Sequence, residues 1–169
     1  MYHIRKAVPA DADKIKAVTK QAFRLYQEEL HSDTPVYALS ETDADILADI
    51  SHNAVFVAEG ADGKILGAIR YCDLGGGLAY IYRFAVEPQI NNLGIGSDLL
   101  SHVISECEAT GFFAIALHTN SKYYKLARYY YGKQFFVHST DNSKGYIRAL
   151  FVKELKPGAE YDLSPAFKK

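Results

Sequence analysis

The stretch VEPQINNLGIGSDLL, residues 86–100, joins an apolar run to a proline, a turn with two glycines and an amphipathic helix. Gly94 and Gly96 carry no Cβ, so the backbone there can approach a ligand closely. The first amides of the following helix have no intrahelical acceptor, and with the helix dipole they favour a phosphate. Leu99 stands where a dinucleotide-binding GxGxxG motif needs its third glycine, and no Gly-Lys-Ser/Thr of a P-loop follows. On these residues alone, a phosphate site and a plain tight turn both remain open.

Hydrophobic spacing on either side of this stretch predicts alternating strands and helices. Apolar residues recur at helical spacing after Asp11, which can cap a helix, and after a second cap at Ser40 or Thr42. We expect helices over about 12–30, 42–52, 96–110 and 122–132. We expect strands over 3–8, 54–58, 65–72, 78–86, 113–117, 135–138 and 146–155. The predicted order is β α α β β β α β α β β, an α/β fold.

Length and composition indicate one globular domain. The chain has 169 residues, 49% of them apolar and 23% charged, which argues against disorder, collagen and coiled coil. We expect a domain over 1–155 and a C-terminal tail over 156–169. No apolar run approaches the ~18 residues of a membrane span, and the N-terminus is too charged for a signal peptide. Cys72 and Cys107 form no CxxC pair, so we expect reduced thiols and a cytoplasmic location, without a membrane partner.

Charge is distributed unevenly along the chain. The net charge is −1, so no basic field invites nucleic acid. Residues 122–169 contain ten basic residues and four acids. Between Leu25 and Gly63 there is no Lys or Arg. Solvated surfaces account for most such runs, but an acidic stretch can also attract a cationic ligand. The nine acids of this stretch are Glu28, Glu29, Asp33, Glu41, Asp43, Asp45, Asp49, Glu59 and Asp62.

Residues 86–100 resemble motif A of the GNAT superfamily of N-acetyltransferases, V-x-P-x-x-[QR]-x-x-G-x-G/A. Val86, Pro88, Gly94 and Gly96 match it in register, and the element order resembles the GNAT fold over residues 3–155. The resemblance implies a mixed, mostly antiparallel seven-stranded sheet flanked by four helices, with acetyl-CoA or another acyl-CoA as donor. It implies that the pyrophosphate lies on the amides of Asn92, Leu93, Gly94, Ile95, Gly96 and Ser97. It also implies that the pantetheine arm pairs with the backbone of Phe84, Ala85 and Val86.

Two positions depart from motif A. Asn91 replaces the usual Arg or Gln, and Asn92 replaces the usual Gly. Asn91 can still donate a hydrogen bond, and Asn92 tolerates a left-handed backbone better than most residues. We therefore expect the loop to keep its shape and to bind the cofactor less tightly. Lys122, Lys125 and Arg128 are candidates for replacing the missing charge, although an ordinary solvated side chain is the simpler reading of each.

Residues 127–136 are similar to the second GNAT marker, A-R-x-[FL]-Y-x-x-x-G-F, with Phe135 in place of its Gly. Tyr131 falls on the tyrosine that many members place beside the cofactor sulfur. A phenol of pKa ~10 is protonated at neutral pH and can donate to a leaving thiolate. Tyr131 is therefore the candidate general acid, and Tyr130 is the adjacent alternative. Asn120 is expected to do the work of an asparagine that the family often places before this tyrosine.

A general base is less evident. Some family members carry a Glu on the central strand, six residues before the valine of motif A, and that position is Tyr80. The strand contains no acid, and the two-residue alternation places Tyr80, Tyr82 and Phe84 on one face. His118, Asp73 and a chain of waters are the alternatives for the base.

The resemblance implies that a backbone N–H near Phe84 or Ala85 stabilises the oxyanion. The histidines show no HxH or HxxxH spacing, so we expect no metal. We predict an acetyl-CoA-dependent N-acetyltransferase acting on a primary amine of a small molecule or peptide, with a cationic acceptor if the acidic stretch shapes its site. The alternatives are a non-catalytic acyl-CoA-binding module and an interaction domain on the same fold. A homodimer through the last strands is compatible with the pattern, but no residue indicates it.

Overall fold

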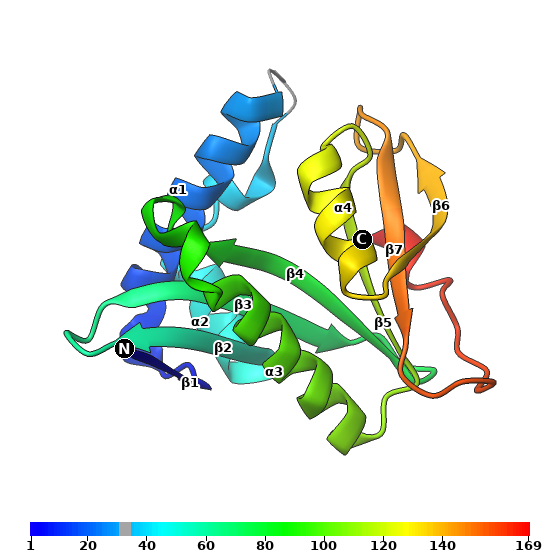
Figure 1. Cartoon of the computed structure of the whole chain (residues 1–169), viewed down its shortest axis with the longest axis horizontal. Helices are drawn as coiled ribbons and strands as arrows, with labels where there is room; N and C mark the ends of the chain where they lie inside the picture. Colours follow the sequence, from blue (N-terminus) through cyan, green and yellow to red (C-terminus); the bar gives the residue numbers. More distant parts are fainter. Residues whose placement is uncertain (31–34) are drawn as a thin grey trace. The chain divides into compact units, whose positions relative to one another are not determined.

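The computed structural model describes residues 1–30 and 35–169, with the backbone alone at 91 and 92 (Figure 1). The predicted loop over 31–40 therefore lies partly outside the described residues. The strands are β1 Tyr2–Lys6, β2 Ala54–Gly60, β3 Ile65–Asp73, β4 Leu78–Val86, β5 Ala114–Asn120, β6 Phe136–Asp141 and β7 Arg148–Glu154. The helices are α1 Ala12–Leu30, α2 Asp43–His52, α3 Ile95–Thr110 and α4 Tyr124–Gly132. The predicted order of elements is confirmed.

The seven strands form one mixed sheet in the order β1-β2-β3-β4-β5-β7-β6. The pairs β1/β2, β2/β3, β5/β7 and β6/β7 are antiparallel. β4 and β5 run parallel where Leu78–Tyr80 pairs with Ala114–Ala116. This arrangement confirms the predicted α/β fold, with a mostly antiparallel seven-stranded sheet and four helices.

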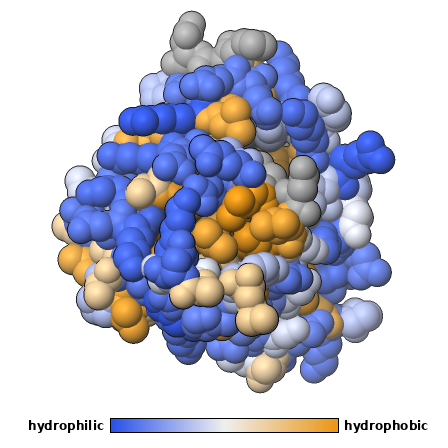
Figure 2. All heavy atoms as spheres, turned by 60° about the vertical axis from the view of Figure 1, so that its left-hand side comes forward, coloured by the Kyte–Doolittle hydropathy of each residue, from blue (hydrophilic) through white to orange (hydrophobic). Residues whose placement is uncertain are grey.

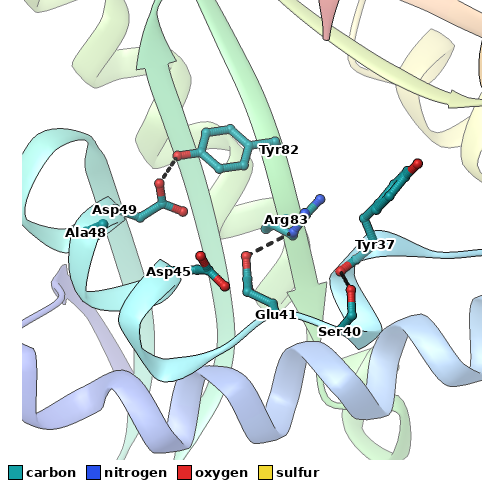
Figure 3. A pocket seen from close by; sticks show the side chains of 8 residues that line it. All are labelled: Tyr37, Ser40, Glu41, Asp45, Ala48, Asp49, Tyr82 and Arg83. Atoms are coloured by element: carbon teal, nitrogen blue, oxygen red, sulfur yellow. Dashed lines mark hydrogen bonds and ion pairs between the residues drawn. The ribbon is translucent and has the colours of Figure 1, made fainter.

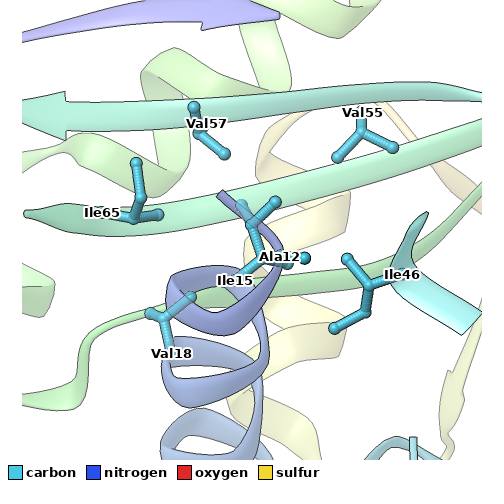
Figure 4. Close-up of a cluster of buried hydrophobic side chains, with 8 residues drawn as sticks. Ala12, Ile15, Val18, Ile46, Val55, Val57 and Ile65 are labelled. Carbon is cyan, nitrogen blue, oxygen red and sulfur yellow. The ribbon is translucent and has the colours of Figure 1, made fainter. Parts of the chain in front are cut away.

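Residue contacts divide the chain into two units, which are described separately. The first unit comprises Met1–Cys72 and Tyr82–Val103. Its hydrophobic core lies between α1, α2 and the strands β2 and β3 (Figure 4). The ring of Phe56 points the other way from β2, and its centroid lies 4.7 Å from the imidazole of His102 in α3. The first two helices and α3 therefore cover opposite faces of these strands. The core consists of Ala12, Ile15, Val18, Ile46, Val55, Val57, Ile65 and Ala68.

The helices α2 and α1 of the first unit differ in how their N-termini are capped. Thr42 caps α2, because its Oγ1 accepts from the N–H of Asp45 while Asp45 Oδ2 accepts from the N–H of Thr42 at 2.8 Å. The predicted cap at Thr42 is thus confirmed. The predicted cap at Asp11 is wrong, because Asp11 ends a 3-10 turn before α1. Its carboxylate accepts from the N–H of Val8 at 2.8 Å and pairs with Arg5 at 2.7 Å.

β4 does not alternate regularly along its length. Arg83 has a φ of 51°, in the left-handed region. Tyr82 and Arg83 both turn toward α2 and the residues before it: the hydroxyl of Tyr82 donates to Asp49, and Arg83 Nε donates to Glu41. Phe84 instead lies against the first turn of α3. The prediction that Tyr82 and Phe84 share a face is wrong, because an irregularity at Arg83 reverses the alternation.

The second unit comprises Asp73–Ile81 and Ile104–Lys169. β5 is longer than predicted, because its pairing with β7 continues to Asn120 opposite Arg148. His118 and Asn120 therefore lie within the strand. The segment 156–169 also makes contacts in this unit: Tyr161 donates to Glu154 at 2.9 Å, and Ala166 is fully buried.

The surface in Figure 2 is mostly hydrophilic on the face that it shows, with hydrophobic side chains gathered in separate patches. Within residues 1–30 and 35–169, no helix is long and apolar enough to cross a membrane. Cys72 and Cys107 are not joined in a disulfide. Burial raises the pKa of Cys107 to about 12, so this thiol is unreactive at neutral pH.

Candidate active site

The turn from β4 into α3 is built by Pro88 and Gly94. Pro88 opens a 3-10 turn over Pro88–Leu93, where its missing N–H is not needed. Gly94 has a φ of 78°, a conformation that costs an ordinary residue about 1–2 kcal/mol. The N–H of Asp98 donates to the carbonyl of Gly94 at 3.0 Å. Residues 95–97 therefore form the first turn of α3, whose amides have no acceptor within the helix.

The two glycines of the turn do different work. A Cβ at Gly94 would meet no described heavy atom within 4 Å, so the backbone here is uncovered. A Cβ at Gly96 would lie 3.4 Å from Val86 Cγ2 and 3.6 Å from Phe84 Cζ, so Gly96 lets α3 pack closely on β4. An uncovered glycine before the amides of a helix N-terminus fits the phosphate of a nucleotide cofactor.

The predicted cofactor residues of this turn lie together in the first unit. Ile95 is fully buried, so it can offer a ligand its backbone only, whereas Leu93 is 64% exposed. The carbonyl of Ala85 faces Gly67 on β3. The side chains of Asn91 and Asn92 lie outside the described residues. The set that the structure brings together is Phe84, Ala85, Val86, Leu93, Gly94, Ile95, Gly96 and Ser97.

The two candidate tyrosines of α4 have different environments in the second unit. Tyr130 is 5% exposed, and its ring packs against Phe135 and Phe151 at centroid distances of 5.6 and 5.5 Å. Tyr131 is 56% exposed and touches Phe151 with its ring edge-on at 5.6 Å. Tyr130 is thus a core residue, whereas more than half of Tyr131 is exposed.

The remaining cofactor candidates also belong to the second unit. Asn120 is 7% exposed, and its Oδ1 accepts from the N–H of Lys122 at 2.9 Å. This bond gives Asn120 a role in the turn from β5 into α4. Lys122, Lys125 and Arg128 are exposed. Asp73 accepts from the N–H of Gly75 at 2.7 Å and thereby supports the turn after β3.

His118 is hydrogen-bonded to Tyr80 and lies near the carboxylate of Asp141, both in the second unit. Its Nδ1 lies 2.8 Å from the hydroxyl of Tyr80, and its Nε2 lies 3.8 Å from Asp141 Oδ2. Asp141 is held in turn by Arg148 Nε at 2.9 Å. Burial and the charges of Arg148 and Lys144 lower the pKa of His118 to about 4, although Asp141 opposes the shift. The imidazole is therefore neutral at pH 7 and binds a proton weakly.

The low pKa of His118 makes the folded state sensitive to acid. In the unfolded chain its pKa is near 6.5, so between pH 6.5 and 4 the unfolded state binds the extra proton. The contribution of the neutral His118 to the free energy of unfolding is complete above pH 6.5 and is lost as the pH falls toward 4. It amounts to about 3 kcal/mol. We expect urea unfolding at pH 7 and pH 4.5 to show a smaller loss of stability in His118→Gln than in the wild type. Equal losses in the two proteins would contradict the buried neutral imidazole.

A comparison with family models identifies the kind of protein to which this geometry belongs. The model of the acetyltransferase (GNAT) family matches residues 20–136, which include the turn before α3 and all of α4. The chain belongs to the GNAT acetyltransferase family. None of the curated proteins compared with it matches.

Solved structures similar to this GNAT chain cover nearly its whole length. PaiA N-acetyltransferase from Thermoplasma acidophilum, in complex with coenzyme A, has a TM-score of 0.79 and 19% identity over 91% of this chain and 99% of that one. YncA, a putative acetyltransferase from Salmonella typhimurium with its cofactor acetyl-CoA, has a TM-score of 0.75 and 19% identity, over 96% of this chain and 98% of that one. The ribosomal-protein-S18-alanine N-acetyltransferase from Escherichia coli has a TM-score of 0.74 and 15% identity, over 95% of this chain and 97% of that one. At these identities the likeness concerns the fold.

A buried arginine organises the acids of the first unit of this GNAT protein. The side chain of Arg70 is fully buried. Its Nη1 donates to Glu41 and to Asp49 at 2.8 Å each, and its Nη2 donates to Glu41 at 2.9 Å. Burial alone lowers the pKa of Arg70, but these two carboxylates outweigh it and raise the pKa. The charges of Glu41 and Asp49 are therefore neutralised inside the protein. This pairing weakens the argument that the acidic stretch attracts a cationic acceptor.

Several residues of these sites were not identified from the sequence as acting together. Arg70 and Arg83 each stand inside a mainly apolar strand, and that placement was the available signal. Asp141 gave no such signal in the sequence, because it stands among polar residues typical of a turn. Within the described residues, no group of three His, Cys, Asp or Glu side chains is placed to hold a metal ion.

Proposed function

We propose that this GNAT protein transfers an acetyl group from acetyl-CoA to a primary amine. The proposal rests on the turn from β4 into α3, where Gly94 adopts a φ of 78° before the helix N-terminus, in a segment that the family model matches. Bound acetyl-CoA supplies the acetyl group as an activated thioester. The backbone amides of residues 92–97 would hold its pyrophosphate, and the backbone of residues 84–86 its pantetheine arm.

Tyr131 is the general acid in this proposal. Its side chain is 56% exposed, whereas the ring of Tyr130 is fixed in the core. The amine nitrogen forms the new C–N bond as the C–S bond of the thioester breaks. Tyr131 holds a proton at its hydroxyl oxygen and gives it to the departing sulfur, which neutralises the thiolate.

The proton of the amine leaves by a different route. His118 is a poor acceptor for it, because a pKa of about 4 lies far below the ~10.4 of a lysine-like ammonium. Asp73 is engaged in the turn that follows β3. Among the alternatives drawn from the sequence, a chain of waters therefore has the best support, and we assign no side chain as base.

Thermal and chemical unfolding with acetyl-CoA tests the donor site. At about 100 times its dissociation constant, acetyl-CoA should stabilise the protein by about 2.7 kcal/mol. The Gly94→Ala variant should lose most of this gain, because its backbone must leave the left-handed region or bear the strain. Gly158→Ala is the matched control: Gly158 also has a positive φ, of 74°, and a Cβ there would also meet no described heavy atom within 4 Å.

Both glycine variants should lose similar stability without ligand, and only Gly94→Ala should lose the response to acetyl-CoA. No stabilisation of the wild type would contradict the proposed donor site. Stabilisation without release of the coenzyme A thiol over a panel of amines would contradict catalysis and support the acyl-CoA-binding module.

A further inference from the structure

A pocket of about 480 Å³ opens in the first unit beside β4. Figure 3 shows that its side chains come from the turn before α2, from α2 itself and from β4. Its lining is polar and carries both signs of charge. The residues that line it are Tyr37, Ser40, Glu41, Asp45, Ala48, Asp49, Tyr82 and Arg83.

Two of the three acids in the pocket already have their partners. Both oxygens of Glu41 accept from Arg70, and Oε1 also accepts from Arg83. Asp49 accepts from Arg70 with one oxygen and from Tyr82 with the other, at 2.8 Å in each case. These two carboxylates and the two arginines balance in charge. A polyamine entering the pocket would compete with the buried Arg70 for Glu41 and Asp49.

Arg83 has donors left over. Its Nε donates to Glu41 Oε1 at 3.1 Å, and in the described part of the chain neither terminal nitrogen has a partner. Its side chain is 28% exposed. The two terminal N–H groups of a guanidinium form a planar fork that matches the two oxygens of a carboxylate. The φ of 51° at Arg83 is a strained conformation of the kind that persists at ligand sites, and it aims this side chain away from the face that holds Phe84.

Asp45 offers the opposite charge in the same pocket. Its Oδ2 accepts from the N–H and the hydroxyl of Thr42, while Oδ1 has no partner among the described residues. Bonds from Thr42 and, more weakly, the charges of Arg83 and Arg70 lower the pKa of Asp45, so it is ionised at neutral pH. The pocket thus combines a free cationic fork with a free carboxylate oxygen.

From this arrangement we infer that the amine acceptor is an amino acid whose carboxylate binds the terminal nitrogens of Arg83, while Asp45 accepts a hydrogen bond from its nitrogen-bearing end. An amino acid carries both groups on one small molecule, whereas a polyamine has no partner for Arg83. The inference rests on the proposed acetyl transfer, because it names the acceptor of that reaction.

The experiment tests each of the common amino acids and its carboxamide as acetyl acceptors. Spermidine is tested beside them as a purely cationic acceptor. Release of the coenzyme A thiol gives kcat/KM for each acceptor. For the best acceptor we expect the free acid to exceed its amide by roughly tenfold or more, the discrimination that a charged hydrogen-bonding site gives against an analogue lacking the group. In Arg83→Gln this ratio should fall to near one. Arg24→Gln removes an exposed cation of α1 outside the pocket and should leave the ratio unchanged.

Ligand-detected NMR with the same acid–amide pairs, in the presence of coenzyme A, separates failure of this inference from failure of the proposed function. A preference for the acid that depends on Arg83 supports the inference even if no acetyl transfer occurs. Acetylation of spermidine without any amino acid would uphold the transferase and overturn the inference. A preference for the acid that survives Arg83→Gln, or binding of acid and amide alike, would also overturn it.

Discussion

Replacing Tyr131 with phenylalanine should lower kcat by about a hundredfold to ten-thousandfold, the usual range for the loss of a general acid. The hydroxyl is the group removed, and without it the sulfur must leave as an unprotonated thiolate. The ring remains, so its contact with Phe151 at 5.6 Å is kept and the fold should be unaffected. The KM for acetyl-CoA should change little, because the lost interaction is one that strengthens as the C–S bond breaks. Steady-state release of the coenzyme A thiol measures both quantities.

Tyr124→Phe is the matched control for this experiment. Tyr124 also lies on α4 and is 70% exposed, so its substitution removes a tyrosine hydroxyl from the same helix. We expect kcat to stay within a factor of about two in this control, since exposed groups outside a site contribute little. A similar fall in both variants, or an unchanged kcat in Tyr131→Phe, would refute the role of Tyr131 as general acid.

The second large effect is expected at Arg70. Replacing it with methionine should destabilise the protein by about 3–5 kcal/mol, the cost of breaking a buried ion pair from one side. Glu41 is nearly buried, with 7% of its side chain exposed, and it would lose two of its three hydrogen bonds. Asp49 would lose its ion pair as well. Urea unfolding at pH 7 measures the loss of free energy.

A triple variant tests whether the unpaired acids cause this loss. Arg70→Met combined with Glu41→Gln and Asp49→Asn removes the buried charges together. It should recover a large part of the stability lost in Arg70→Met, because neutral amides are much less costly to bury than unpaired carboxylates. If the triple variant is no more stable than Arg70→Met, packing of the arginine stem and not charge accounts for the effect.

The sequence carried the information for the turn before α3 almost completely. Pro88 and Gly94 act through local backbone geometry, which depends on neighbours in the chain, whereas Gly96 allows α3 to pack closely on β4. The cap at Thr42 was predictable for the same reason, since its partner Asp45 is three residues away. The true role of Asp11 was not predictable in this way, because its carboxylate forms an ion pair with Arg5 on β1.

The candidate site was less completely predictable. His118 and Tyr80 were each identified separately, but they are 38 residues apart, and only the pairing of β4 with β5 brings them within 2.8 Å. The environment of His118 then depends on Arg148, Lys144 and Asp141, which the final hairpin supplies. Its low pKa is a property of that packing, and no local pattern encodes it.

By itself, the sequence determined the family, the order of elements, the strand boundaries of β4 and the glycine turn, since these follow from hydrophobic periodicity and local backbone preference. The tertiary structure alone decided which charges remain available. Arg70 neutralises acids that lie 21 and 29 residues before it in the chain, and a reversal of alternation at Arg83 turns its guanidinium toward them. Charge compensation and side-chain direction depend on contacts between distant segments, so the acidic run in the sequence contributes a pocket in which two of three acids are paired with arginines.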